Sequence, residues 1–226
     1  MIKLKYFYRR AAAKTGEGFS TQKEKKEETN LEQKLISAAE EGNTETVLKL
    51  IEAGADIDAT DEHGVTAVMA ATQKYHTDTV KALIEQGADI NIRNSNQDNV
   101  LLYAGAEGFL EIVKLAVGAG ADTSLTNRFG GTALIPASER GHVDVVEELL
   151  MNSDTDVNHI NNLQWTALLE AIILGNGGEN HQKIVKLLID HGADIHIGDK
   201  DGITPLEHAE RLDFKEIERI LKESQA

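Results

Sequence analysis

Gly54-Ala55-Asp56 is the first of four copies of one tripeptide, and the others are Gly87-Ala88-Asp89, Gly120-Ala121-Asp122 and Gly192-Ala193-Asp194. The first three copies follow one another at intervals of 33 residues. A fixed period of this size predicts a solenoid, because each unit is too small to bury its apolar face except against its neighbours. The chain is therefore expected to be an array of similar units that has no single globular core.

A second anchor recurs in the same register, a Thr or Asn that precedes apolar residues: Thr66, Asn99, Thr132, Thr166 and Thr204. The steps between these anchors are 33, 33, 34 and 38 residues. One extra residue is assigned to 152–154, next to the degenerate tripeptide Asp154-Thr155-Asp156. Five extra residues are assigned to Gly175–Asn180. These two insertions account for the longer interval before Gly192.

Each unit has the same predicted order of elements. A turn such as Asp61-Glu62-His63-Gly64 comes first, and glycine allows its positive φ. A first helix follows, and the side chains of Thr66, Thr132, Thr166 and Thr204 are suited to be its N-cap; in the last unit Pro205 stands at its first position. After a break near Gly42, Gly108 or Gly141, a second amphipathic helix runs to the glycine of the tripeptide, which suits a left-handed C′ position.

Three stretches resemble ankyrin repeats: Gly202-Ile203-Thr204-Pro205-Leu206-Glu207-His208-Ala209, Gly141-His142-Val143-Asp144-Val145-Val146 and Gly192-Ala193-Asp194-Ile195. The resemblance covers about residues 28–226. Within this range the sequence is similar to short bacterial ankyrin proteins. It implies an all-α solenoid of about six helix-turn-helix units with β-hairpin tips, whose tips and first helices form a concave face. The predicted units are 28–60, 61–93, 94–126, 127–160, 161–198 and 199–226.

Two positions depart from the family pattern. Gln97 and Gln164 stand where other units have the turn glycine, so their tips are expected to differ from the usual turn. Pro136 lies inside a predicted first helix, where it is expected to free the carbonyl near Thr132.

Residues 1–27 lack the repeat and form a basic N-terminal tail. Residues 1–26 hold eight Lys and Arg against two Glu, a balance of +6, which leaves −21 for the rest of a chain whose net charge is −15. The tail is interpreted as a solvated or artificially added leader, with a basic aromatic patch for a membrane or partner and a segment folded back on the acidic array as alternatives. The spacing of Asn30 and Gln33 predicts a capping box at the start of the first helix.

Composition narrows the function. There is no cysteine, so thiolate chemistry and disulfides are excluded. The acidic array argues against binding of nucleic acid phosphates, and no apolar run is long enough for a membrane span. Phosphate loops and hydrolase or zinc-protease motifs are missing, so we predict neither an enzyme nor a cofactor. The expected location is the cytoplasm, with export of a bacterial protein as the alternative.

The histidines are interpreted mainly as structural. His76 and His142 occupy the slot between the two helices of a unit, where the resemblance implies a structural role. His191 and His196 are an exposed pair that could share a metal ion, and no metal site is predicted. A rival hypothesis uses the Gly175–Asn180 loop and the histidines to handle a small molecule or metal, and a third makes the chain a structural adaptor held by its tail.

The predicted function is non-enzymatic recognition of another protein, of unknown identity, by a monomeric array. Positions that vary between units form the candidate surface, which changes from polar to apolar along the chain. Its aromatic, leucine and arginine side chains resemble the composition of binding hot spots. The alternative for Trp165 is packing within the array. The predicted site consists of Arg128, Phe129, Arg140, Leu163, Trp165, Ile173 and Leu174.

Overall fold

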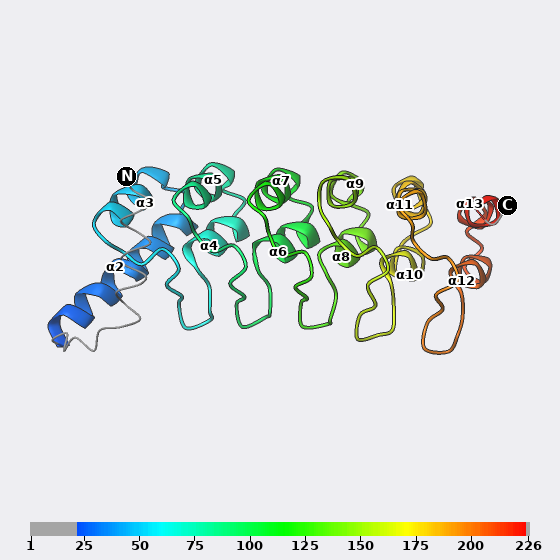
Figure 1. Cartoon of the computed structure of the whole chain (residues 1–226), viewed down its shortest axis with the longest axis horizontal. Coiled ribbons are helices and arrows are strands. Elements are labelled where there is room, and N and C mark those ends of the chain that lie inside the picture. Colours follow the sequence, from blue (N-terminus) through cyan, green and yellow to red (C-terminus); the bar gives the residue numbers. More distant parts are fainter. Residues whose placement is uncertain (1–21, 225–226) are drawn as a thin grey trace.

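The computed structural model describes residues 22–224, with side chains from residue 31 onward, as one row of paired helices (Figure 1). The pairs α2–α3, α4–α5, α6–α7, α8–α9, α10–α11 and α12–α13 are called units 1 to 6. The loops between units project to one side of the row as narrow tips (Figure 1). The helices are α2 (Gln22–Glu40), α3 (Thr44–Glu52), α4 (Ala67–Gln73), α5 (Thr77–Glu85), α6 (Val100–Glu107), α7 (Leu110–Gly118), α8 (Leu134–Glu139), α9 (Val143–Asn152), α10 (Ala167–Ile173), α11 (Glu179–Asp190), α12 (Pro205–Arg211) and α13 (Lys215–Glu223). The all-helical solenoid predicted from the repeat is confirmed.

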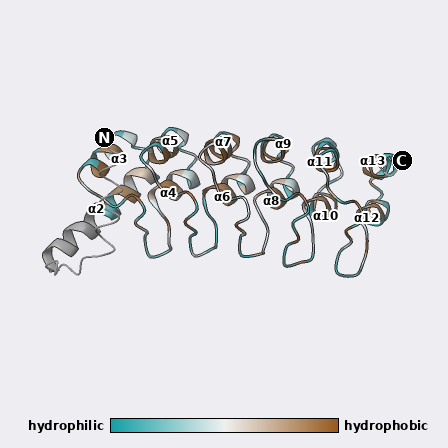
Figure 2. Ribbon diagram, viewed as in Figure 1, coloured by the Kyte–Doolittle hydropathy of each residue, from teal (hydrophilic) through white to brown (hydrophobic). Residues whose placement is uncertain are grey.

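The core runs through the whole row. The helices carry the hydrophobic positions and the tips are mostly hydrophilic (Figure 2). A column of alanines on the first helices is fully buried, which lets neighbouring first helices approach closely. Its members are Ala71, Ala104, Ala137, Ala171 and Ala209. The array is therefore held by contacts between adjacent units, as expected for a solenoid.

The tips are hairpin-shaped turns with little β structure. An isolated antiparallel bridge between Thr60 and Thr66 is the single β pairing within residues 22–224. The shape is set by the first residue of each tip, as Asp61 shows in unit 2. Its Oδ1 accepts hydrogen bonds from the backbone N–H groups of His63 and Val65, both at 2.8 Å. A short polar side chain thus replaces the ladder of a β-hairpin.

The two glutamine tips keep the common turn, so the prediction that they differ is wrong. Gln97 and Gln164 have φ values of 66° and 63°, close to the 74° of Gly64. Gln164 N–H also donates to the Asn161 carbonyl at 3.0 Å, the same bond that Gly64 makes to Asp61 at 3.1 Å. Left-handed backbone costs a non-glycine residue roughly 1–2 kcal/mol. The tip tolerates that cost because its other hydrogen bonds are all retained.

The predicted N-caps are confirmed for Thr66, Thr166 and Thr204 and wrong for Thr132, and Asn99 is a further cap that was not predicted. Side chains of Thr66, Asn99, Thr166 and Thr204 accept from the backbone N–H three residues later. Thr132 does not, and its buried Oγ1 has no hydrogen-bond partner.

Pro136 explains the exception in unit 4. The Thr132 carbonyl accepts from Ile135 N–H at 3.2 Å, three residues on, in a tightened first turn. The expectation that Pro136 frees this carbonyl is therefore also wrong. Ile135 N–H, which a Thr132 cap would have used, is already engaged, and proline is tolerated because it lies in the first turn.

A left-handed glycine follows the second helix at each of the four tripeptides, as predicted, and left-handed residues also follow several first helices. Gly54, Gly87, Gly120 and Gly192, which follow the second helices, have φ between 78° and 101°. Gly42, Gly108 and Gly141, which follow first helices, have φ between 71° and 78°. In unit 2 the same slot is filled by Tyr75, whose φ is 59°.

Histidines tie consecutive units together. His76 Nε2 lies 3.0 Å from the Glu40 carbonyl oxygen, and His142 Nε2 lies 3.1 Å from that of Ala106. The structural role predicted for these two is confirmed. His181 forms the same contact, 2.9 Å from the Glu139 carbonyl oxygen, and was not predicted. The sequence signal is its distance from His142, which equals one repeat plus the six inserted residues.

The loops add a second set of bonds between units. The side chains of Asp58, Asn91 and Asn158 each accept from the backbone N–H of an aspartate one unit later: Asp89 at 2.8 Å, Asp122 at 3.0 Å and Asp194 at 2.8 Å. At the junction of units 3 and 4, where the tripeptide is degenerate, Thr123 Oγ1 donates to Asp154 Oδ1 instead. The Asp of the tripeptide thus marks a structural junction.

The first helix begins earlier than predicted. Since α2 starts at Gln22, Asn30 lies inside the helix and the predicted capping box is wrong. The rest of the predicted tail, residues 1–21, lies outside the described residues. Among the helices in the described part of the chain, none combines the length and apolar character that a membrane span requires.

Candidate partner-binding surface

Two large apolar side chains stand at the same place on adjacent tips. Phe129 of unit 4 is 54% exposed and Leu163 of unit 5 is 50% exposed. The tips are joined by a hydrogen bond from Asn162 N–H to the Phe129 carbonyl at 3.0 Å. The pairing of the two tips therefore places Phe129 and Leu163 next to each other at the edge of the array.

Arg128 lies over the Phe129 ring. Its guanidinium carbon is 4.8 Å from the centre of the Phe129 ring, within the range of a cation–π contact. Its Nη1 also donates to Asn96 Oδ1 of the preceding tip at 3.4 Å. Arg128 is thus positioned by contacts on both sides while it remains exposed.

Trp165 and the end of α10 extend the surface away from the tip. Trp165 is half-buried, and its backbone N–H donates to Asn161 Oδ1 at 3.1 Å. Ile173 is half-buried, and Leu174, just beyond α10, is 50% exposed. The intermediate exposure of Trp165 is compatible both with contact to a partner and with packing within the array.

Arg140 is engaged elsewhere. Its Nη1 lies 2.7 Å from Glu107 Oε1 and 2.8 Å from the Ala106 carbonyl oxygen, both in unit 3. It therefore bridges α6 and α8, and its cation is already paired. Of the predicted residues, Arg128, Phe129 and Leu163 are brought together by the tips, while Arg140 serves the junction behind them.

Glu170 was missed by the sequence analysis. It lies on α10, is 5% exposed, and its Oε1 accepts from Asn161 Nδ2 at 2.6 Å. Burial raises the pKa of the Glu170 carboxyl to about 7, and the Glu139 carboxylate acts in the same direction against the Asn161 hydrogen bond. The signal in the sequence was the position four residues after the cap, where units 2, 3 and 4 have Ala70, Tyr103 and Pro136.

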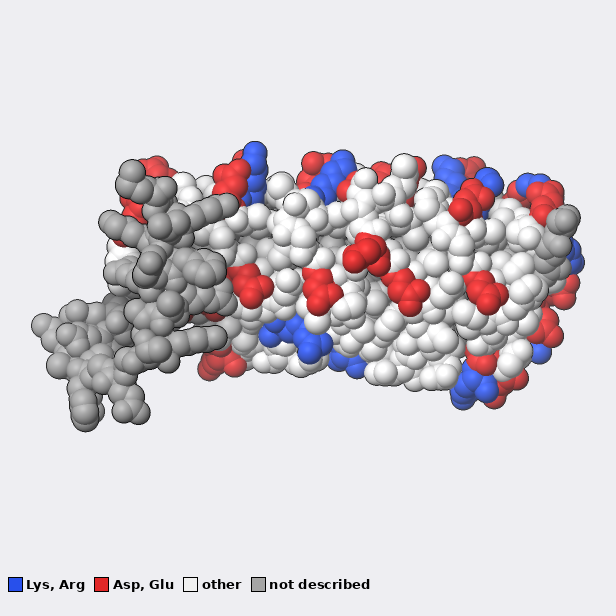
Figure 3. All heavy atoms as spheres, in the orientation of Figure 1, with Lys and Arg blue, Asp and Glu red and all other residues white. Residues whose placement is uncertain are grey.

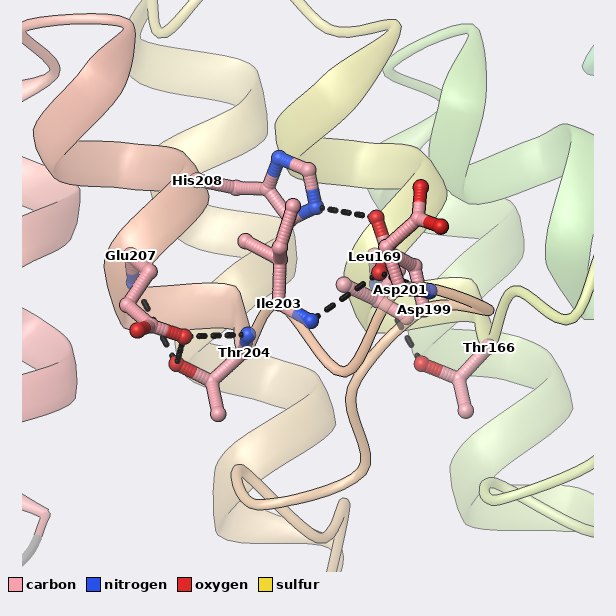
Figure 4. Close-up of polar contacts among 8 residues, drawn as sticks. All are labelled: Thr166, Leu169, Asp199, Asp201, Ile203, Thr204, Glu207 and His208. Atoms are coloured by element: carbon pink, nitrogen blue, oxygen red, sulfur yellow. Dashed lines mark hydrogen bonds and ion pairs between the residues drawn. The ribbon is translucent and has the colours of Figure 1, made fainter.

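Unit 6 shows the same kind of brace with other residues. His208, also four residues after its cap, lies with Nε2 2.9 Å from Asp199 Oδ2 of its own tip (Figure 4). Figure 4 also shows the capping box of Thr204 and Glu207 beside it. In units 5 and 6, therefore, a side chain from the first helix holds the first residue of the tip.

Units 2 and 3 carry a different set of side chains. Lys74 lies 3.2 Å from Glu40, so its charge is paired with unit 1. Tyr75 is 48% exposed, and its ring centre lies 4.5 Å from that of Phe109. This aromatic pair occupies the turn between helices, at the opposite end of the first helix from the tip.

Charge is spread over the molecule. On the face seen in Figure 3, acidic side chains recur at nearly regular intervals along the row, while Lys and Arg lie mainly at its upper and lower edges. Within residues 22–224 no group of three or more His, Asp or Glu is arranged to hold a metal ion. His191 Nδ1 faces the Leu187 carbonyl oxygen at 2.8 Å.

Known proteins with similar sequences and structures have this same architecture. The family model for ankyrin repeats (three copies) matches residues 35–127 and 101–199, more than half of the chain. The chain belongs to the ankyrin-repeat family. A curated relative, the putative ankyrin repeat protein YahD of Escherichia coli K12, is 50% identical over 76 residues, which are 34% of this chain and 38% of YahD. The aligned part thus spans little more than a third of that relative.

Solved structures match over a greater length. An ankyrin repeat domain from Acinetobacter baumannii AYE is 49% identical with a TM-score of 0.82, over 85% of this chain and 97% of that one. The ankyrin repeat protein EF0377 is 39% identical with a TM-score of 0.80, over 83% and 96% of the two chains. The human ASB11 ankyrin repeat domain is 25% identical with a TM-score of 0.70, over 85% and 83%.

Proposed function

We propose that this ankyrin-repeat protein is a non-enzymatic scaffold that binds another protein through the concave face of units 4 and 5. The family serves in general as a protein-interaction module. The observation that carries the proposal is the exposure of Phe129 and Leu163 at matching places on tips that are hydrogen-bonded to each other. Large exposed apolar groups on an acidic surface are typical of contact sites, because their exposure to water is unfavourable and a partner can bury them.

The surface has the make-up of a binding centre. Aromatic residues and arginine are enriched at hot spots, and Arg128 is stacked on Phe129. Trp165, Ile173 and Leu174 continue the same surface along unit 5. We assign Arg140 a supporting role, because its guanidinium is used in the pair with Glu107.

The competing small-molecule or metal function has weaker support. His181, the histidine beside the Gly175–Asn180 loop, has Nδ1 3.0 Å from Asn176 Oδ1 and Nε2 2.9 Å from the Glu139 carbonyl oxygen. Both ring nitrogens therefore have partners in the protein. This loop is better explained as the device that keeps His181 in the inter-unit slot.

The experiment compares two exposed apolar positions. Proteins captured by the wild-type chain are identified by mass spectrometry, and each is tested against Phe129→Ser and Met151→Ser. Met151 is 64% exposed at the end of α9, away from the tips, so it is a matched control. We expect a partner that is lost with Phe129→Ser and retained with Met151→Ser. Partners that treat both variants as wild type would contradict the proposed face.

A further inference from the structure

We propose that the surface of units 4 and 5 takes a peptide segment in which a Lys or Arg is flanked by apolar side chains, and that the cation pairs with Glu170 and Glu139. This inference rests on the proposed function and specifies the chemistry of the partner. The observation behind it is the position of the Glu170 carboxyl beside the apolar surface, where no basic side chain of the described residues is paired with it.

Asn161 is the residue that places Glu170 there. Its Oδ1 accepts from the N–H groups of Leu163 and Trp165, at 2.9 and 3.1 Å, and its Nδ2 donates to Glu170. One buried side chain thus links the apolar tip to the carboxyl below it. Ile173, three residues after Glu170, lies on the same side of α10, and Leu174 follows just beyond the helix. The carboxyl is therefore linked through Asn161 to the tip that carries the apolar groups of the proposed contact surface.

Glu170 lacks a countercharge within the described part of the chain. The groups that act on it are the Asn161 amide and the Glu139 carboxylate, and the second of these has the same sign. The basic side chains of the surface are already engaged: Arg140 with Glu107, and Arg128 with the Phe129 ring. A buried carboxyl that faces another carboxylate gains most from a cation supplied by a ligand.

Glu170 is 5% exposed, and one of its two carboxyl oxygens remains for such a cation. The Asn161 bond uses Oε1 of Glu170. In the described residues, the side-chain polar atoms sealed from solvent without a partner are Asn99 Nδ2 and Thr132 Oγ1, so Oε2 of Glu170 is not one of them. A long Lys or Arg side chain can reach such an atom while its methylene groups pack against Trp165 and Leu174.

The test is a selection for binding chemistry. A random-sequence peptide phage library is panned on the immobilised full chain, and recovered peptides are synthesised and titrated in solution. The receptors are wild type, Phe129→Ser, Glu170→Gln and Glu147→Gln. Glu147 is exposed on α9, so its substitution removes a carboxylate of the same kind outside the surface. Melting curves establish that each variant is folded.

We expect peptides that depend on Phe129 to carry a Lys or Arg beside aromatic or aliphatic residues. Their affinity should fall about tenfold or more with Glu170→Gln and stay unchanged with Glu147→Gln. Changing the peptide's basic residue to Gln should cause a similar loss, and the two losses should not add. If Glu170→Gln does not fold, Glu139→Gln replaces it, with a smaller loss expected.

Two results would overturn the inference, and they differ in what they say of the proposed function. Peptides that require Phe129 but have no basic residue, or that bind Glu170→Gln as well as wild type, reject the cation and leave the binding face intact. If no recovered peptide depends on Phe129, both the cation and the face are rejected.

Discussion

Units 2 and 5 carry different side chains at equivalent positions of the tip and first helix. Their first helices start alike, with Met69 N–H bonded to Thr66 at 3.3 Å and Leu169 N–H bonded to Thr166 at 3.2 Å. Beyond the caps they diverge. Unit 2 has Val65, Ala70, Gln73 and Lys74 where unit 5 has Trp165, Glu170, Ile173 and Leu174.

The difference separates folding from recognition. The single charge of the unit 2 set, on Lys74, is paired with Glu40 of the preceding unit. The set in unit 5 includes exposed apolar groups and an acid without a cation. Because the caps, the alanine column and the tip bonds are shared, these few positions can change without loss of the fold. The predictions below test this separation.

The largest effect is expected from removing unit 6. Truncation after Gly198 uncovers α10 and α11, which pack on α12 and α13. Residues such as Ile217 and Leu221, both fully buried, would be lost from that junction. We expect aggregation or loss of cooperative unfolding, measured by circular dichroism melts and light scattering, because a terminal unit must cover the apolar face of its neighbour. A monodisperse truncation with an unchanged melt would contradict this.

Glu170→Gln should stabilise the protein at alkaline pH. The folded-state pKa of Glu170, about 7, lies above its ordinary value of 4.5. Stability linked to this group is therefore full below about pH 4.5 and is lost as pH rises to about 7. The variant should gain on the order of 2–3 kcal/mol over wild type at pH 8.

The measurement is urea unfolding of Glu170→Gln and wild type at several pH values. The difference between the two proteins should vanish near pH 4.5, and Glu62→Gln on the exposed tip of unit 2 should show no such trend. A difference that is independent of pH would mean that Glu170 does not ionise in the folded state over this range.

Trp165→Ala should weaken partner binding by about 2 kcal/mol. The matched change in unit 2, Val65→Ala, should leave affinity nearly unchanged. Titration calorimetry with a captured partner or selected peptide measures both. If Trp165 only packs within the array, the variant will instead melt at lower temperature and lose binding in proportion to its unfolded fraction.

The smallest effect concerns the tip backbone. Gln164→Gly should stabilise the protein by about 0.5–1 kcal/mol, because glycine removes the left-handed strain at some entropic cost. Gln97→Gly, in unit 3, should give the same gain, since the φ values differ by only a few degrees. Unequal gains in the free energy of urea unfolding would show that the side chains that differ between units 3 and 5 influence the tip backbone.

The sequence by itself determined the architecture. The period of 33 residues, the cap residues and the tripeptide glycines are local signals, because a cap or a left-handed turn depends on residues a few positions apart. They correctly predicted the helix pairs, while the resemblance to ankyrin repeats implied the structural roles of His76 and His142. Local signals misled where a neighbour competed for the same atom, as Ile135 N–H shows at Thr132.

Only the tertiary structure decided which charged side chains of units 4 and 5 are paired and which are buried. Arg140 is an isolated cation in the sequence, yet stacking brings it to Glu107, 33 residues away, and uses its charge there. Glu170 looks like one more surface acid, yet its own tip supplies the hydrogen bond from Asn161, and stacking on unit 4 brings Glu139 near it. Side-chain charge and exposure depend on which units lie next to each other in space. The contacts of Arg140 with Glu107 and of Glu170 with Glu139 join residues of different units, so no short stretch of sequence specifies them.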